Sequence, residues 1–286
     1  MISYNAFKTK VTGYLGGKYK ENNLHIHKAG KWRDKPCTHI LPEENQKDNF
    51  LFAAQINDKN ELIIENQNVK LHRYWYHLNS SQVMCINFFN KLITEEGKEI
   101  LLKVLKHIIK LDDDVSIEDA SFEYEPDNIE KTNFDFYIKL SNNMQIFWEI
   151  KYTEDGFGKA KAEDLTRSGL THKGKFKDIY EPKLHETLNF KNEKISCEDF
   201  LGNYQINRNV FYVKNKNDFS IFLIPEDNKK TCEQLDKVIG KFENVYKLYW
   251  EELYEIVKKE IENNEELKKY YNDFYEKYFG YKMIKE

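Results

Sequence analysis

The segment NFDFYIKLSNNMQIFWEIK, residues 133–151, decides how this sequence is interpreted. Apolar and aromatic side chains fill two runs, 134–140 and 145–152, which have the length and composition of β-strands. The dipeptide Asn142-Asn143 between them is a turn signal. The pattern therefore predicts two neighbouring antiparallel strands joined by a short hairpin turn.

Charged side chains interrupt these apolar strands at only a few positions. Side chains alternate across a strand, so Glu149 and Lys151 are expected on one face and Trp148 and Ile150 on the other. Asp135 lies on the preceding strand, and the hairpin can bring its carboxylate beside Glu149. The predicted strand pair thus places two acids and one amine close together.

The sequence around this segment predicts further helices and strands. They begin at the N-cap pair Ser80-Ser81 and end at Pro225, which terminates the last strand. In order, we expect two helices with apolar faces at 84–93 and 100–109 separated by Gly97, a strand at 121–125, a helix from Lys159, a helix at about 198–209 and a strand at 219–224. This order predicts an α/β fold with a mixed central sheet flanked by helices.

Two regions flank this core. Residues 1–79 are basic and strand-leaning, with a hairpin expected around Asp58-Lys59-Asn60. Residues 231–286 are expected to be helical, because 231–279 carries acid-to-base pairs four residues apart and an apolar stripe. The sequence therefore predicts three domains: 1–79, a core at 80–230, and 231–286.

Composition excludes several protein classes. The chain has 286 residues, of which 15% are aromatic and only 17 are Gly or Pro, so it is neither disordered nor collagen-like. Its apolar runs are far shorter than the roughly 20 residues of a membrane span, and no signal peptide is expected. The four cysteines form no CxxC pair, which favours a reduced, cytoplasmic protein.

The two predicted carboxylates favour a divalent cation. Adjacent buried acids repel each other, and Mg²⁺, which prefers hard oxygen ligands, removes that cost. Asp135, Glu149 and the main-chain carbonyl of Ile150 are the expected ligands. Lys151 would then orient or deprotonate a water molecule, or hold a phosphate oxygen, which suits phosphodiester hydrolysis. The alternative is a surface strand that carries a solvated Glu149–Lys151 pair.

The pattern Asp135…Glu149-Ile150-Lys151, within a helix–strand–strand–strand–helix order, resembles the PD-(D/E)XK nuclease superfamily. The segments 131–136 and 149–158, with Gln205 and Arg208 on the following helix, resemble its bacterial type II restriction-endonuclease-like branch. The resemblance implies Mg²⁺ (with Mn²⁺ as a substitute) on Asp135 and Glu149, water attack assisted by Lys151, and a site or phosphate held by Gln205 and Arg208. One departure is Phe134, which stands where the superfamily usually has Pro.

Nucleases of this kind often have a further acidic site residue that comes earlier in the sequence. Glu123 and Glu125 share a face of the first core strand, and we favour Glu123. The helical acids are the other candidates: Glu95, Glu96 and Glu99.

Two further groups of residues suggest binding. His25, His27, Cys37 and His39 could ligate Zn²⁺, although strand-face and loop residues are the better interpretation. Residues 1–35 carry eight Lys or Arg against two acids, and 156–183 carry seven against four. Such basic segments favour contacts with a phosphate backbone despite the net charge of −4; their alternative is an ordinary solvated surface.

These observations predict a Mg²⁺-dependent DNA endonuclease, most simply a type II restriction enzyme that acts on double-stranded DNA. By analogy, cleavage of both strands of a palindrome favours a homodimer, and restriction implies a cognate methyltransferase in the same system. The alternatives are a repair or structure-specific nuclease with the same core, or a non-catalytic nucleic-acid-binding protein that keeps the fold.

Overall fold

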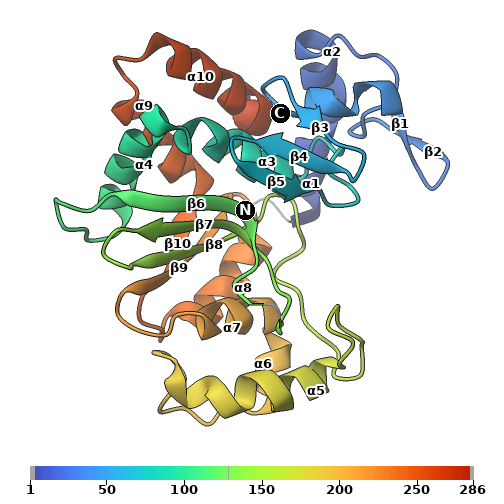
Figure 1. The fold of residues 1–286 in the computed structure, drawn as a ribbon. Helices are drawn as coiled ribbons and strands as arrows, with labels where there is room; N and C mark the ends of the chain where they lie inside the picture. Colours follow the sequence, from blue (N-terminus) through green and yellow to red (C-terminus); the bar gives the residue numbers. More distant parts are fainter. Residues whose placement is uncertain (1–3, 128, 284–286) are drawn as a thin grey trace. The chain divides into compact units, whose positions relative to one another are not determined.

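The computed structural model describes residues 4–127 and 129–283. They divide into two compact units, which are described separately (Figure 1). The first unit contains residues up to Asp113 together with 225–228 and the segment from Trp250 onward. The second unit contains Asp114–Ile224 and Lys229–Tyr249. These units cut across the three predicted regions, because 80–113 falls in the first unit and 229–249 in the second; the three-domain division stays a prediction.

The second unit is built on a five-stranded mixed sheet of order β10-β9-β8-β7-β6 (Figure 1). Strands β6, β7 and β8 are antiparallel, whereas β9 and β10 continue the sheet in parallel with β8. The predicted mixed α/β core is confirmed. The strands are β6 (Ile117–Tyr124), β7 (Phe134–Leu140), β8 (Gln145–Ile150), β9 (Asp218–Ile224) and β10 (Val245–Tyr249).

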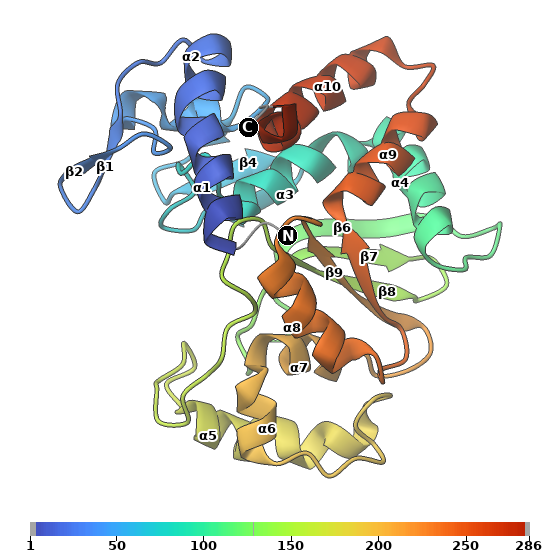
Figure 2. The ribbon, with the colours of Figure 1, turned by 180° about the vertical axis from the view of Figure 1, so that it is seen from behind.

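Helices of the second unit bury an aromatic core against one face of this sheet. Strand residues Phe147 and Phe222 share this core with Ile206 and Val210 of α7 and Leu235 of α8. Strand β9 is buried along its whole length, as expected for a central strand in parallel pairing. Figure 2 shows α8 and α7 beside the sheet. The helical segments are α5 (His172–Lys175), η4 (Phe176–Tyr180), η5 (Glu181–Glu186), α6 (Cys197–Gly202), α7 (Tyr204–Phe211) and α8 (Lys229–Ile239).

Strands β7 and β8 separate at one end. Their pairing stops at Phe136 opposite Trp148. Beyond that point β7 stays paired with β6 as far as Phe134, and β8 stays paired with β9 as far as Ile150. The sheet therefore forks between the two strands, and we call this gap the β7–β8 fork.

The first unit packs helices around the buried helix α3 (Ser81–Phe89). Phe88 contacts the rings of Trp250 and Phe274, with centroids 5.2 and 5.0 Å away. The hydroxyl groups of Tyr270 and Tyr271 donate to the carbonyls of Asn87 and Phe88. The helices are α1 (Tyr4–Tyr14), η1 (Leu15–Tyr19), α2 (Lys20–Asn23), η2 (Glu43–Asn49), α3, η3 (Asn90–Leu92), α4 (Glu95–Ile108), α9 (Trp250–Glu260), α10 (Glu265–Phe279) and η6 (Gly280–Met283).

Two small sheets complete the first unit. Strands β1 (Gly30–Trp32) and β2 (Lys35–Cys37) form a hairpin, and β3 (Gln55–Ile56), β4 (Glu61–Ile64) and β5 (Gln67–Lys70) form an antiparallel sheet. The hairpin predicted around 58–60 is confirmed as the β3–β4 connection.

Several local predictions differ from the structure. Residues 4–23 are helical rather than extended, and 245–249 form edge strand β10 within a region expected to be helical. No helix begins at Lys159; the chain runs through turns until α5 begins at His172. Gly97 lies inside α4 rather than between helices. A Cβ there would lie 2.0 Å from the carbonyl oxygen of Lys91, so close packing of the preceding turn requires glycine.

Across residues 4–127 and 129–283, the helices are too short or too polar to cross a bilayer.

Candidate active site

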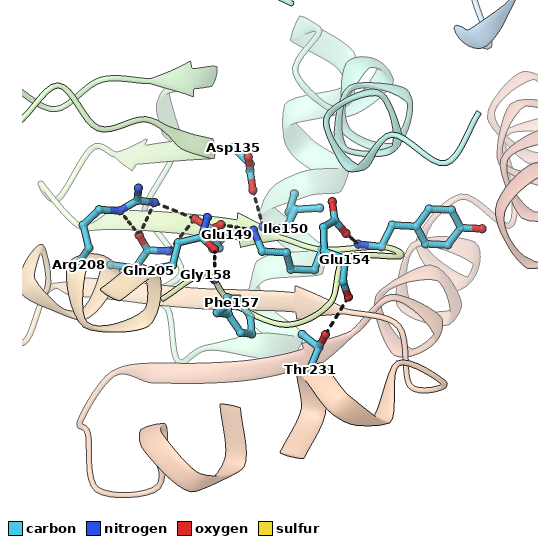
Figure 3. A network of polar contacts seen from close by, with 12 residues as sticks. Asp135, Glu149, Ile150, Glu154, Phe157, Gly158, Gln205, Arg208 and Thr231 are labelled. Atoms are coloured by element: carbon cyan, nitrogen blue, oxygen red, sulfur yellow. Dashed lines mark hydrogen bonds and ion pairs between the residues drawn. The ribbon is translucent and has the colours of Figure 1, made fainter. Parts of the chain in front are cut away.

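Glu149 is the centre of the polar network at the β7–β8 fork (Figure 3). Its side chain is buried, and it accepts hydrogen bonds from Lys151 Nζ at 2.5 Å, Asn209 Nδ2 at 2.8 Å and Arg208 at 3.2 Å. Burial alone would raise the pKa of Glu149, but the charges of Lys151 and Arg208 outweigh burial and lower it. Glu149 is therefore an ionised carboxylate held by three donors.

Asp135 lies across the fork on β7. Its Oδ2 accepts a hydrogen bond of 2.6 Å from the main-chain N–H of Ile150. This contact takes the place of the ladder bond that the separated strands lack. Burial, and then the negative charge of Glu149, raise the pKa of Asp135 to about 8. The two acids thus have opposite tendencies: Glu149 is ionised, whereas Asp135 resists ionisation.

Lys151 follows Glu149 on the same face, as the alternation predicted. Burial would lower the pKa of Lys151, but the charges of Glu149 and Asp135 outweigh burial and raise it. The amine is therefore a cation at neutral pH, which suits it to orient a water molecule or contact a phosphate rather than to accept a proton. Its Nζ also lies 5.5 Å from the ring centroid of Phe157.

The loop after β8 is fastened by two glutamines. Gln234 of α8 accepts from the N–H of Phe157 at 2.8 Å and donates to its carbonyl at 3.0 Å. Gln205 of α7 accepts from the N–H of Gly158 at 3.2 Å (Figure 3). Glu154 accepts from the N–H of Tyr152 at 2.6 Å, and its carbonyl accepts from Thr231. These hydrogen bonds fix the loop after β8 at both ends and so hold Phe157 beside Lys151.

The predicted residues therefore occupy different places. Asp135, Glu149, Ile150, Lys151 and Arg208 come together at the fork. Gln205 lies on the same helix as Arg208, but its amide holds the Gly158 loop.

The sequence prediction missed Asn209. Its side chain is fully buried, donates to Glu149 and accepts from Arg208 at 3.1 Å. Asn209 lies next to Val210 and Phe211, on the buried side of α7. A polar side chain in such a position needs a buried partner, and this signal could have identified it.

Glu130 forms a second buried network that the sequence prediction also missed. Its carboxylate is paired with Lys175 at 2.7 Å and accepts from the hydroxyl groups of Tyr180 and Tyr212. Lys175 belongs to the basic segment 156–183, which was predicted to contact a phosphate backbone, but its side chain is buried against Glu130. That pair fastens α5 to the segment before β7.

The position of Glu123 bears on the choice of a third acid. It lies on β6 with φ of 50°, and its carboxylate accepts from Asn133 at 3.2 Å. Its negative charge contributes to the raised pKa of Asp135, after burial and the charge of Glu149. Glu125 follows the end of β6, and the helical acids Glu95, Glu96 and Glu99 belong to α4 of the first unit.

The His and Cys residues near the N-terminus form a smaller cluster than a zinc site needs. Cys37 Sγ lies 3.5 Å from His39 Nδ1. Within 4–127 and 129–283, no three His, Cys, Asp or Glu side chains gather in a way that could hold a metal ion. The Mg²⁺ site predicted at the fork instead uses two carboxylates and a main-chain carbonyl.

The residues at the fork fit a hard divalent cation. The N–H of Ile150 points at Asp135, so its carbonyl faces the same side of β8, where the ladder to β7 has ended. Carboxylate and carbonyl oxygens are the donors that Mg²⁺ prefers, and a positive charge there would offset the cost of ionising Asp135.

Comparison with known proteins adds one match. The family described as "Restriction Endonuclease associating with ARP" matches residues 14–279. No curated protein and no solved structure matches the chain.

Proposed function

The chain belongs to the family of restriction endonucleases associating with ARP, and we propose that it is a Mg²⁺-dependent DNA endonuclease of the type II restriction kind. The family match spans most of the chain, and the mixed sheet is consistent with a restriction-endonuclease-like core. We further propose that this core is of the PD-(D/E)XK type, with Asp135, Glu149 and Lys151 as its motif residues.

The observation that carries the proposal is the pair of acids at the fork. Asp135 has a pKa raised to about 8 by burial and by Glu149, while Glu149 stays ionised. The native state keeps a proton on Asp135 that the unfolded chain releases, so the metal-free protein loses stability as pH rises from about 4 to 8, and a cation in the fork would offset that cost.

The proposed roles follow from the contacts. Asp135, Glu149 and the Ile150 carbonyl would hold Mg²⁺, which supplies an activated water molecule and neutralises charge on the phosphate. Lys151, a cation beside Glu149, would orient that water molecule or a phosphate oxygen. Arg208 and Asn209 position Glu149 by hydrogen bonds to its Oε2, and Gln205 positions the Gly158 loop. Glu123 is proposed as an additional acid beside Asp135, and Mn²⁺ as a substitute metal.

Cleavage of DNA by Asp135→Asn and wild-type protein tests the proposal. We expect wild type to cut plasmid or phage DNA only with Mg²⁺ or Mn²⁺, and Asp135→Asn to bind DNA without cutting it. Glu118→Gln is the control, because Glu118 lies on the neighbouring strand β6 and is paired with exposed Lys139. Equal cutting by Asp135→Asn and wild type would refute a role for the fork in cleavage.

The products identify the kind of nuclease. Discrete fragments from unmodified DNA support a restriction enzyme, whereas nicking only at branched or damaged sites supports the repair alternative. Absence of cutting with retained binding supports a non-catalytic protein.

The proposed partners are double-stranded DNA, a second copy of this chain and a cognate methyltransferase. The family's description also names an association with ARP, which we propose for this chain without assigning it a surface. Sedimentation and co-purification from the native host test these assemblies.

A further inference from the structure

An exposed cluster of rings lies in the first unit, outside the candidate active site. Trp32 at the end of β1 is 37% exposed and Tyr74 is 40% exposed. Their ring centroids are 5.0 Å apart, and the ring of His77 lies 5.6 Å from Trp32 and 5.2 Å from Tyr74. Large apolar rings that gather on a surface mark a binding site.

Two guanidinium groups accompany the rings. Arg33 lies 5.8 Å from the centroid of Trp32, and Arg73 lies 5.3 Å from that of Tyr74. The chain has only four arginines, so half of them are here. Among the described residues, no carboxylate lies within ion-pair distance of either one. We call Trp32, Arg33, Arg73, Tyr74 and His77 the aromatic–arginine patch.

The charge around the patch is opposite to that of the chain. Segments 30–37 and 70–77 contain five Lys or Arg and one acid, whereas the whole chain has a net charge of −4. Lys35 lies directly opposite Trp32 in the hairpin. This local excess of positive charge favours a polyanionic partner over an apolar partner or a protein surface with few acidic residues.

The backbone of the patch is strained. The two-residue turn between Trp32 and Lys35 consists of Arg33 and Asp34, with φ of 48° and 64°. A hairpin turn with two positive φ values strongly prefers Asn-Gly, and other residues there cost free energy. Strain of this kind is typical of functional sites, and here it places a guanidinium at the tip of the hairpin.

We propose that the aromatic–arginine patch binds unpaired bases of a DNA strand. Exposed rings offer faces on which bases stack, and arginines contact both base faces and phosphates. Bases within a duplex are already stacked on each other, so the rings favour a single-stranded or opened segment. The choice of DNA as the polymer rests on the proposed function, but the patch is separate from the cleavage chemistry.

Tryptophan fluorescence reports on this patch directly. The other three tryptophans, Trp75, Trp148 and Trp250, are at most 6% exposed, so Trp32 is the indole that a ligand can reach. We expect oligothymidylate to quench the fluorescence of the 286-residue protein in EDTA, which removes the metal that the proposed cleavage needs. Trp32→Phe should abolish the quenching while circular dichroism stays unchanged.

Matched variants measure the contribution of stacking. Binding of fluorescein-labelled oligothymidylate, followed by anisotropy, should weaken about tenfold in Tyr74→Ala. Tyr246→Ala is the control, because Tyr246 is a 38% exposed tyrosine on β10 of the second unit and should bind like wild type. Arg73→Gln should reduce the slope of log affinity against log salt by about 0.7, the loss of one single-strand phosphate contact.

Three results would overturn the inference: quenching that survives Trp32→Phe, equal weakening in Tyr74→Ala and Tyr246→Ala, or equal quenching by a blunt duplex. Because binding is measured without metal and can be repeated with Asp135→Asn, its outcome is independent of cleavage. A protein that binds oligothymidylate but never cuts DNA would refute the proposed function and leave the patch intact.

Discussion

At the scale of single residues, Asp135 and Glu149 differ because their partners differ. Glu149 receives donors from Lys151, Arg208 and Asn209, while Asp135 accepts from a main-chain N–H. In a buried setting each donor favours the ionised carboxylate. The charges of Lys151 and Arg208 keep Glu149 ionised, whereas burial and the charge of Glu149 raise the pKa of Asp135.

Stability of the metal-free protein should depend on Asp135. Its pKa rises from the ordinary 3.8 to about 8 on folding, because of burial and the charge of Glu149. Between these values the native state keeps a proton that the unfolded chain releases, so the free energy of unfolding falls as pH rises from 4 to 8. Urea unfolding in EDTA should show this fall in wild type and a smaller one in Asp135→Asn. The same dependence of unfolding free energy on pH in wild type and Asp135→Asn would contradict this prediction.

Asn209→Ala tests the support of Glu149. Loss of a donor to a buried carboxylate should lower the free energy of unfolding by about 1–3 kcal/mol. It should also raise the Mg²⁺ concentration needed for half-maximal cleavage. Asn207→Ala is the matched control: Asn207 is buried on the same helix but donates to the carbonyls of Asp199 and Phe200. It should destabilise similarly and leave the Mg²⁺ requirement unchanged; an equal shift in both variants would contradict a specific role for Asn209.

At the scale of elements, the loop after β8 depends on Gly156. Its φ is +89°, and a Cβ there would lie 2.5 Å from Gln234 Oε1, the atom that accepts from Phe157 N–H. Gly158 has no such conformation, and a Cβ there would meet only Gln205 Oε1 at 4.0 Å.

We therefore expect Gly156→Ala to lower the free energy of unfolding by about 1–3 kcal/mol, through strain and loss of the Gln234 contact. Cleavage should fall as well, because Phe157 leaves Lys151. Gly158→Ala should change stability by less than about 1 kcal/mol. Urea denaturation and cleavage rates of the two variants provide the comparison, and equal effects would refute the strain argument.

Elements with a strong local pattern were predictable from sequence. Strand β7 has the predicted bounds, and β8 and β9 differ from prediction by two residues or fewer, because apolar runs between turn signals identify strands. Strand β10 was missed because Tyr246 and Trp250 also fit a helical stripe. Its assignment depends on parallel pairing with distant β9, which local sequence does not contain.

The part of the candidate site that lies on β7 and at the end of β8 was also predictable from sequence. Alternation along β8 predicted that Glu149 and Lys151 would be neighbours, and the hairpin predicted Asp135. Asn209 and Glu130 were not predicted, because their partners come from elements 60 and 45 residues away in the chain. Only the packing of α7 and α5 against the sheet brings these residues into place.

At the scale of the whole molecule, charge is distributed unevenly. A net charge of −4 disfavours nonspecific association with DNA, while residues 1–35 carry eight bases and two acids. The proposed DNA contact is therefore expected on limited basic surfaces, which release counterions from the phosphates that they neutralise.

Binding of duplex DNA should be correspondingly sensitive to salt. With Asp135→Asn, which is expected not to cut, a rise from about 50 to 200 mM NaCl should weaken binding at least about tenfold, the loss expected for two neutralised phosphates. Fluorescence anisotropy measures the slope. A salt-independent affinity would contradict backbone contact by the basic segments.

In the proposed metal site, the separation of β7 from β8 has a consequence for ion selectivity. Asp135 and Glu149 sit on backbones that share no ladder bond beyond Phe136 and Trp148. A change in the separation of their carboxylates would break no ladder bond between β7 and β8, although it would disturb the Asp135–Ile150 hydrogen bond. In such a site the distance between the two carboxylates can adjust to the ionic radius of the metal. Larger ions such as Ca²⁺ should therefore bind as readily as Mg²⁺. Discrimination between the two ions should arise in the rate of turnover rather than in binding affinity.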